Sequence, residues 1–214
     1  MKKSIYSLAL SENVIRAVDE AAYKCGMSRS AIINRILAEK LECDTPEMRM
    51  EEISDSMEAI LGDIVQVERQ RSAMLLVVKS VLEYKYRPTI SYKLELERVP
   101  DEYIGTLRVG IRTRSERLID LFNSFFLYWI KFEKGRYAQM GRACPACELS
   151  SGRYSRRLYK PADIIVEDDG SAIGEYIRAL DRAVKAFFAD LSGFGAVAPE
   201  LEERTAQTLS LYRI

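Results

Sequence analysis

The chain has 214 residues, of which 48% are hydrophobic and 30% charged, and this composition argues against wholesale disorder. It contains no apolar run long enough for a membrane span, no apolar secretory core near its start and no disulfide-rich pattern among its four cysteines, so we expect a cytoplasmic protein. The net charge of zero hides a basic block, residues 107–160 (12 Lys/Arg against 4 Asp/Glu), between two acidic ones, and oppositely charged surfaces are expected.

The chain begins with a predicted short strand, "KSIYSLAL" (residues 3–10). Tyr6, Leu8 and Leu10 would lie on one of its faces. No partner strand is predicted in the next seventy residues, and a lone strand leaves its backbone donors and acceptors unpaired. We therefore expect a second copy of the chain to supply the partner strand.

Two helices are predicted next. Ser11 is a natural N-cap, Gly26 stands where a left-handed C-cap belongs, and Ser28 begins the second helix. Apolar residues recur at helical spacing in both: Val14, Ile15, Val18, Ala21, Ala22 and Cys25, then Ile32, Ile33, Ile36, Leu37 and Leu41. One strand and two helices are too small to enclose a core, but two copies could do so, with paired strands and four helices.

Residues 4–41, "SIYSLALSENVIRAVDEAAYKCGMSRSAIINRILAEKL", resemble the ribbon-helix-helix family of the Arc, MetJ and CopG type. The resemblance is carried by the Leu10–Ser11 junction and by the "GMSRS" turn (26–30) before an Ile-rich helix. It implies that residues 1–43 form a DNA-binding and dimerisation domain. The antiparallel ribbon of the homodimer would lie in the major groove of double-stranded DNA.

The resemblance also implies residue roles. The outward face of the ribbon would contact base edges through Lys3, Ile5, Ser7 and Ala9. The start of the second helix would hold a phosphate at Ser28, Arg29 and Ser30, while Lys2, Lys3 and Arg29 would add salt-sensitive phosphate contacts. Family members tend to present longer polar side chains from the ribbon, so modest base discrimination is expected here. A ribbon-helix-helix used only for dimerisation is the alternative.

Residues 44–214 are predicted to form an α+β regulatory or oligomerisation domain, which makes the whole chain α+β and mainly helical. Asp44–Pro46 would be a hinge, followed by a long helix at about 47–86. Its expected apolar seam steps by four and three residues, with Arg71 filling the one gap: Ile53, Met57, Ile60, Ile64, Val67, Met74, Val78 and Val81. This seam fits either a coiled coil along the dimer axis or an ordinary core helix.

Alternating residues then predict a β-hairpin, "TISYKLELER" (89–98) and "TLRVGIRT" (106–113), with one apolar and one charged face. A capping-box pattern predicts a helix at about 114–134, rich in aromatic residues. Helical spacing predicts two more helices, at about 172–192 and 199–212.

Cys144 and Cys147, in "GRACPACE" (141–148), have the spacing of a zinc knuckle. The chain has no histidine, so a four-thiolate zinc site would need two such pairs across a dimer axis. A thiol/disulfide switch and a tight turn without a ligand are the alternatives, and the turn is favoured. No other cofactor is expected.

The segment "SGRYSRRLYK" (151–160) places Arg153, Arg156, Arg157 and Lys160 among tyrosines. This pattern predicts a second basic patch for nucleic-acid backbone or an anionic effector, with a solvated loop as the alternative.

We recognise no catalytic motif, and an enzyme is not expected. The predicted function is that of a bacterial-type transcriptional repressor, acting as a homodimer or a higher oligomer. The alternative is an accessory DNA-binding protein of a relaxosome or partition complex on a mobile element, whose second domain recruits a protein partner.

Overall fold

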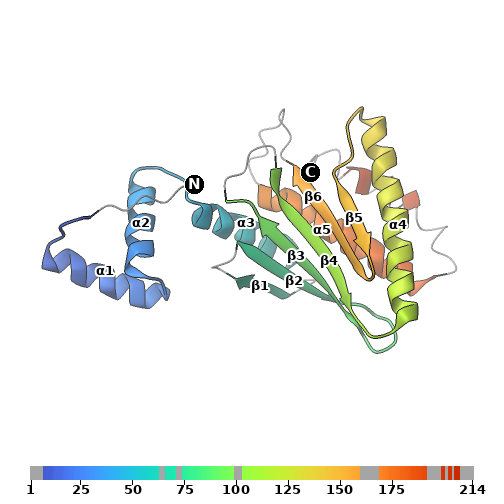
Figure 1. Cartoon of the computed structure of the whole chain (residues 1–214), viewed down its shortest axis with the longest axis horizontal. Helices are drawn as coiled ribbons and strands as arrows, with labels where there is room; N and C mark the ends of the chain where they lie inside the picture. Colours follow the sequence, from blue (N-terminus) through green and yellow to red (C-terminus); the bar gives the residue numbers. More distant parts are fainter. Residues whose placement is uncertain are drawn as a thin grey trace. The chain divides into compact units, whose positions relative to one another are not determined.

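The computed structural model describes residues 7–62, 66–70 (backbone), 74–98, 103–159 and 169–191, with helical positions at 199–200, 202–203 and 205–207, called here the C-terminal helical segment. The chain divides into two compact units, Met1–Glu51 and Glu52–Ile214 (Figure 1). The division falls inside a helix, a few residues beyond the expected hinge.

Two complete helices lie in the described part of the first unit, α1 (Glu12–Cys25) and α2 (Arg29–Lys40), and both were predicted. Gly26 ends α1 with a φ of 60°, the left-handed conformation that glycine adopts without steric cost. Ser28 caps α2, because its hydroxyl accepts a hydrogen bond from the Ala31 amide at 3.3 Å. The described core of this unit is small: Val18, Ala22 and Ile32 form a buried cluster with Ala21, Met27 and Ile33 packed against it, and Ala38 and Met50 are also buried.

The predicted N-terminal strand lies partly outside the described residues, which begin at Ser7. Residues 7–10 have no regular secondary structure and are exposed in the single chain. The two-chain ribbon therefore stays a prediction.

The predicted long helix at 47–86 is wrong. Helix α3 (Pro46–Leu61) ends just before Gly62, and the chain continues into strands β1 (Gln66–Gln70) and β2 (Leu75–Val81). Strand β2 lies between two other strands, and its run of Leu76, Val77 and Val78 is buried. A short apolar run of this kind fits a buried strand as well as a helix, so its spacing alone misassigned it.

The second unit contains a six-stranded antiparallel sheet in the order β1-β2-β3-β4-β6-β5. The predicted hairpin is confirmed as β3 (Thr89–Leu96) and β4 (Tyr103–Arg112), with Tyr92 opposite Val109. A second hairpin, β5 (Cys147–Ser150) and β6 (Arg153–Tyr159), was not predicted, and β6 lies where a solvated loop was the alternative for residues 151–160.

One face of the sheet is covered by two helices, α4 (Glu116–Gln139) and α5 (Asp169–Ala189), and both were predicted with slightly different ends (Figure 1). Phe126 of α4 stacks on Tyr154 of β6, with 4.4 Å between ring centroids. Helix α3 approaches α5 so closely that a Cβ on Gly170 would lie 2.8 Å from the Ile53 backbone. The C-terminal helical segment agrees with the predicted last helix as far as Gln207, and 208–212 lie outside the described residues.

Side chains alternate between the two faces of the sheet. On β3, Ile90, Tyr92 and Leu94 are buried toward the helices, whereas Lys93 points to the other side and is exposed. We call this second side the open face. The α+β fold class is thus confirmed. Among the described helices, none combines the length and the apolar character that crossing a membrane requires.

Candidate functional site

The N-terminus of α2 is the expected phosphate-binding position. The first amides of a helix have no acceptor within the helix and carry a partial positive charge. Ser28 and Ser30 are exposed, with 3.2 Å between their hydroxyl oxygens. The Arg29 guanidinium is engaged with Asp19 of α1, including a 2.7 Å bond from Nη2 to Oδ2, and its side chain is 70% exposed. The Asp19 carboxylate therefore offsets part of the positive charge that Arg29 would offer to a phosphate at this helix N-terminus.

The predicted ribbon residues are placed only in part. Lys2, Lys3 and Ile5 lie outside the described residues, while Ser7 and Ala9 are exposed. Their exposure in the single chain leaves both side chains accessible to a partner.

The first unit leaves much of its apolar surface uncovered. Of the twelve large hydrophobic residues exposed in the described chain, eight lie between residues 8 and 41. They are Leu8, Leu10, Val14, Ile15, Tyr23, Ile36, Leu37 and Leu41. Soluble proteins rarely leave large contiguous apolar patches in water, so this concentration of exposed apolar residues in one short segment is unusual for an isolated chain.

The predicted second basic patch needs a correction. Arg156 points into the core and has no exposed surface, so it cannot contact a nucleic acid. Strand alternation explains why: Arg153 and Arg157 face the opposite side of β6 and are exposed. Lys160 lies outside the described residues.

Arg156 instead belongs to a buried polar cluster. It pairs with Glu133 of α4, with 3.2 Å between Nε and Oε1 and neither side chain exposed. The Tyr154 and Tyr176 hydroxyls donate to the Glu133 carboxylate at 3.2 and 2.9 Å, and Arg156 donates to the Tyr137 hydroxyl at 2.9 Å. Burial raises the pKa of Tyr154 and Tyr176 well above the usual value for tyrosine. The cluster joins the sheet, α4 and α5.

The two cysteines of "CPAC" lie at the edge of this cluster. A hydrogen bond with Cys144 lowers the pKa of Cys147 to about 7 and raises that of Cys144. The Tyr154 hydroxyl lies 3.6 Å from the Cys147 sulfur. Among the described residues, no group of three or more His, Cys, Asp or Glu side chains is arranged to hold a metal ion. A zinc site shared by two chains stays a prediction.

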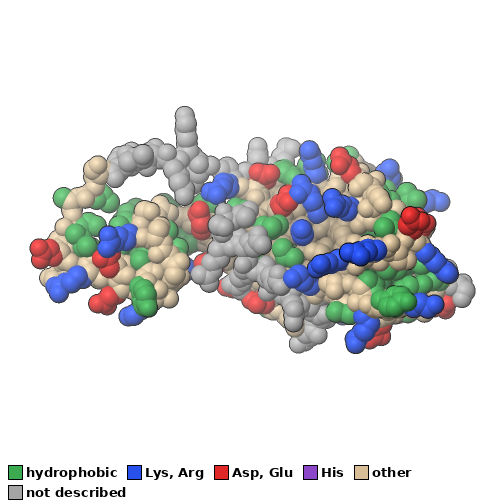
Figure 2. All heavy atoms as spheres, turned by 60° about the horizontal axis from the view of Figure 1, so that its bottom comes forward, with side chains coloured by type: hydrophobic (Ala, Val, Ile, Leu, Met, Phe, Trp, Pro, Cys, Tyr) green, Lys and Arg blue, Asp and Glu red, His purple; other side chains and the backbone are tan. Residues whose placement is uncertain are grey.

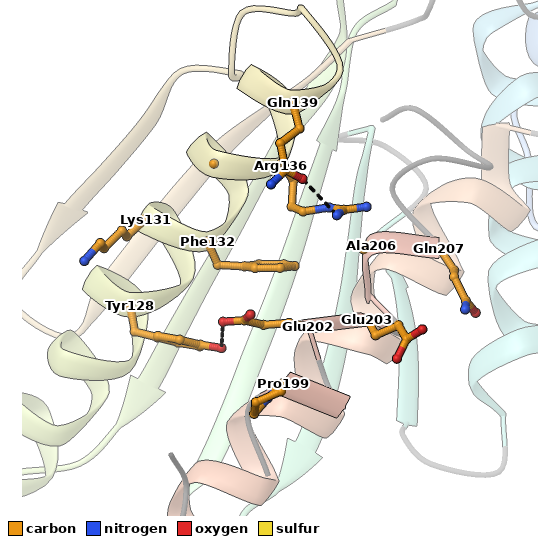
Figure 3. Close-up of a pocket in the computed structure, with 11 residues that line it drawn as sticks. Tyr128, Lys131, Phe132, Arg136, Gln139, Pro199, Glu202, Glu203, Ala206 and Gln207 are labelled. Atoms are coloured by element: carbon orange, nitrogen blue, oxygen red, sulfur yellow. Dashed lines mark hydrogen bonds between the residues drawn. The ribbon is translucent and has the colours of Figure 1, made fainter. Parts of the chain in front are cut away.

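A cavity of about 770 Å³ lies between α4 and the C-terminal helical segment (Figure 3). Lys131 and Arg136 line it from α4, whereas Glu202 and Glu203 line it from the other side. The Tyr128 hydroxyl donates to Glu202 at 2.7 Å and links the two walls. Two basic and two acidic side chains give this lining no net charge, so the cavity does not favour an anionic effector.

The basic residues that the open face brings together were not predicted as a group. They are spread over 79 positions, from Lys79 on β2 to Arg157 on β6, and only the pairing of the strands makes them neighbours. Part of the signal was present, because alternation within "TISYKLELER" and "TLRVGIRT" already placed Lys93 and Arg108 on a charged face.

The sequence matches no known protein family, and comparisons with curated proteins and with solved structures also return no match.

Proposed function

We propose that the protein is a homodimeric, sequence-specific DNA-binding protein of the ribbon-helix-helix type that acts as a transcriptional repressor. The support comes from the order of elements in the first unit. In the sequence, a predicted strand with alternating apolar residues precedes two helices, and in the structure these helices are joined by a left-handed glycine and a serine cap.

The observation that carries the proposal is the uncovered apolar surface of the first unit. Its buried hydrophobic cluster consists of Val18, Ala22 and Ile32, whereas the eight apolar residues named above remain exposed. Leu8 and Leu10 are 62% and 39% exposed, and Leu37 and Leu41 are 46% and 67% exposed. Burying one such side chain contributes about 1.5–3 kcal/mol. In the proposed dimer, residues 3–10 of the two copies would pair with each other. The second copy would then bury the exposed apolar residues and supply the missing partner strand.

The first experiment tests the oligomeric state. Sedimentation equilibrium of the full chain should give a dimer. Leu37→Glu should raise the dimer dissociation constant by at least about 100-fold, because it places a charge in an apolar interface. Asn34→Glu adds the same charge at an exposed polar position of the same helix and should leave the dimer intact. A wild-type chain that stays monomeric contradicts the proposal.

The second experiment tests DNA recognition. Genome-wide footprinting should find a palindromic site at the gene's own promoter. Ser7→Ala should weaken specific binding by about 1 kcal/mol for each hydrogen bond that the hydroxyl makes to a base, with little change on random DNA. No change on the specific site would mean that the ribbon does not contact bases through Ser7.

A relaxosome or partition accessory protein is the second candidate. It is favoured by the weak base-contacting potential of Ile5, Ser7 and Ala9 and by the basic block at 107–160. Footprints at a transfer or partition origin would support this candidate over repression.

A further inference from the structure

The open face of the sheet carries an excess of positive charge. The strand registers place six basic residues on this side of strands β2 to β6: Lys79, Lys93, Arg108, Arg112, Arg153 and Arg157. Two acidic residues, Glu95 and Glu148, lie on the same side of these strands. Lys93, Arg108, Arg112, Arg153 and Arg157 are exposed. Figure 2 shows where Lys and Arg side chains gather on the surface of the second unit.

The basic residues form a band across neighbouring strands. Lys93 lies directly opposite Arg108, and Arg108 lies opposite Ser155, between Arg153 and Arg157 on β6. The exposed members of this band lie on β3, β4 and β6 and therefore cross two strand spacings, or about 10 Å. The band is therefore wide enough to reach several phosphates of one duplex, whose charges are spaced at about 1.7 Å along the axis.

The pairing of Lys93 with Arg108 is unfavourable for the isolated fold. Like charges directly opposite each other on one face of an antiparallel pair are destabilising. An ion pair between Arg108 and Glu95 offsets part of this repulsion, but solvent screens it, because the two side chains are 55% and 41% exposed. A polyanion lying on the band would remove the remaining repulsion.

Hydroxyl groups lie among the basic residues. Ser155 is opposite Arg108, Thr106 is opposite Arg157, and Ser91 is opposite Lys79. Serine and threonine hydroxyls, like lysine and arginine, are among the groups that contact DNA phosphates. Tyr103 and Tyr159 also lie on this face but contact each other, with 5.9 Å between ring centroids, and Arg157 covers Tyr103 at 5.4 Å. Because these rings already contact each other and Arg157, they are less suited to stacking on unpaired bases.

We propose that the open face of the sheet binds the phosphate backbone of double-stranded DNA without sequence preference. This surface deepens the proposed function, because it adds a second contact with DNA to the one made by the N-terminal ribbon. It requires no base contacts and no dimer, so the two proposals can fail separately.

The test compares two triple variants of the full chain. Lys93→Gln, Arg153→Gln and Arg157→Gln remove three charges from the open face. Arg117→Gln, Lys131→Gln and Lys134→Gln remove three exposed charges from α4, which lies on the covered side of the sheet. Both variants change the net charge equally, so long-range electrostatics are matched. Circular dichroism and the fluorescence of Trp129, the single tryptophan, check that each variant is folded.

Binding is measured by fluorescence anisotropy on a random-sequence duplex between about 50 and 200 mM salt. The open-face variant should reduce the slope of log K against log salt by about 2–3, since each phosphate that a side chain neutralises accounts for about 0.9 of that slope. Its affinity should fall at least about tenfold, by the same factor on random DNA and on a specific site. The α4 variant should stay within about twofold of the wild type.

Equal behaviour of the two triple variants overturns the proposal. If the open-face variant loses affinity only for single-stranded DNA or RNA, the proposal that this face binds double-stranded DNA is overturned. A monomeric chain or a missing operator would refute the proposed repressor but would leave the contrast between the two variants unchanged.

Discussion

Glu133 of α4 and Arg156 of β6 form a fully buried ion pair, and the Glu133 carboxylate also accepts hydrogen bonds from two tyrosines. The Arg156 guanidinium lies over the ring of Tyr176 of α5, 4.5 Å from its centroid. One charged pair therefore joins the sheet to both helices that cover it. Such a pair is weak evidence for net stability, but removing one partner leaves the other charge buried and unpaired.

We predict that Arg156→Met lowers the free energy of unfolding by about 3–5 kcal/mol, because it strands the Glu133 carboxylate in the core. Arg153→Met, three residues away on the exposed side of β6, should change it by less than about 0.5 kcal/mol. Urea unfolding followed by Trp129 fluorescence measures both. Similar values for the two variants would mean that water reaches Glu133.

Alkaline pH should destabilise the second unit. Burial raises the pKa of Tyr92, Tyr154 and Tyr176 well above the usual value, so these tyrosines keep their protons in the folded state. In the unfolded chain they ionise near pH 10. The folded state then binds more protons, and stability, fully present below about pH 10, falls above it by up to about 1.4 kcal/mol per pH unit and tyrosine. Urea midpoints at about pH 9 and pH 11, together with tyrosinate absorbance, check this.

The reactivity of Cys147 should depend on Cys144. With its pKa lowered to about 7 by a hydrogen bond with Cys144, Cys147 should react with iodoacetamide with a midpoint near neutral pH. Cys144→Ala removes this bond and should shift the midpoint upward, whereas Cys144→Ser keeps a donor. The measurement requires Cys25→Ser and Cys43→Ser, because both of these thiols are exposed. Identical pH profiles for the alanine and serine variants would refute the assignment.

Metal removal tests the predicted zinc site. Because the unliganded turn is favoured, we expect EDTA to leave the urea midpoint unchanged and metal analysis to find less than stoichiometric zinc. One zinc for every two chains, with a lower midpoint after chelation, would instead establish the site shared by two Cys144/Cys147 pairs.

Two glycines should respond to alanine in opposite directions. A Cβ on Gly105 of β4 would lie 2.3 Å from the Glu95 carbonyl oxygen, which belongs to the paired strand. We expect Gly105→Ala to cost about 2 kcal/mol or more in the free energy of unfolding. Gly135 of α4 has open space around it, so Gly135→Ala should stabilise the protein by about 0.5–1 kcal/mol through helix propensity. Denaturant unfolding compares them, and a destabilised Gly135→Ala would point to a contact along α4.

Local features of the fold were predictable from the sequence. The caps at Gly26 and Ser28 and the alternation in β3 and β4 depend on neighbours within a few residues, and the structure has them where the sequence predicted. The strand β2 was mistaken for helix, because Val78 and Val81 happened to continue the heptad spacing of α3.

The candidate site was only partly predictable. Burial of Arg156 depends on Glu133, which is 23 positions away on another element, so a basic segment in the sequence gave no sign of it. The open face likewise depends on which strands become neighbours. Its basic residues could be assembled only once the order of the strands was known.

In the proposed homodimer, the small core of the first unit makes its stability depend on the concentration of the protein. A segment that folds only as a dimer has a stability that depends on protein concentration through mass action. When the protein is scarce, α1 and α2 would separate from their counterparts and become open to proteases, while the second unit keeps its own core. If the protein represses its own gene as proposed, there would be a minimum protein concentration below which no functional repressor accumulates.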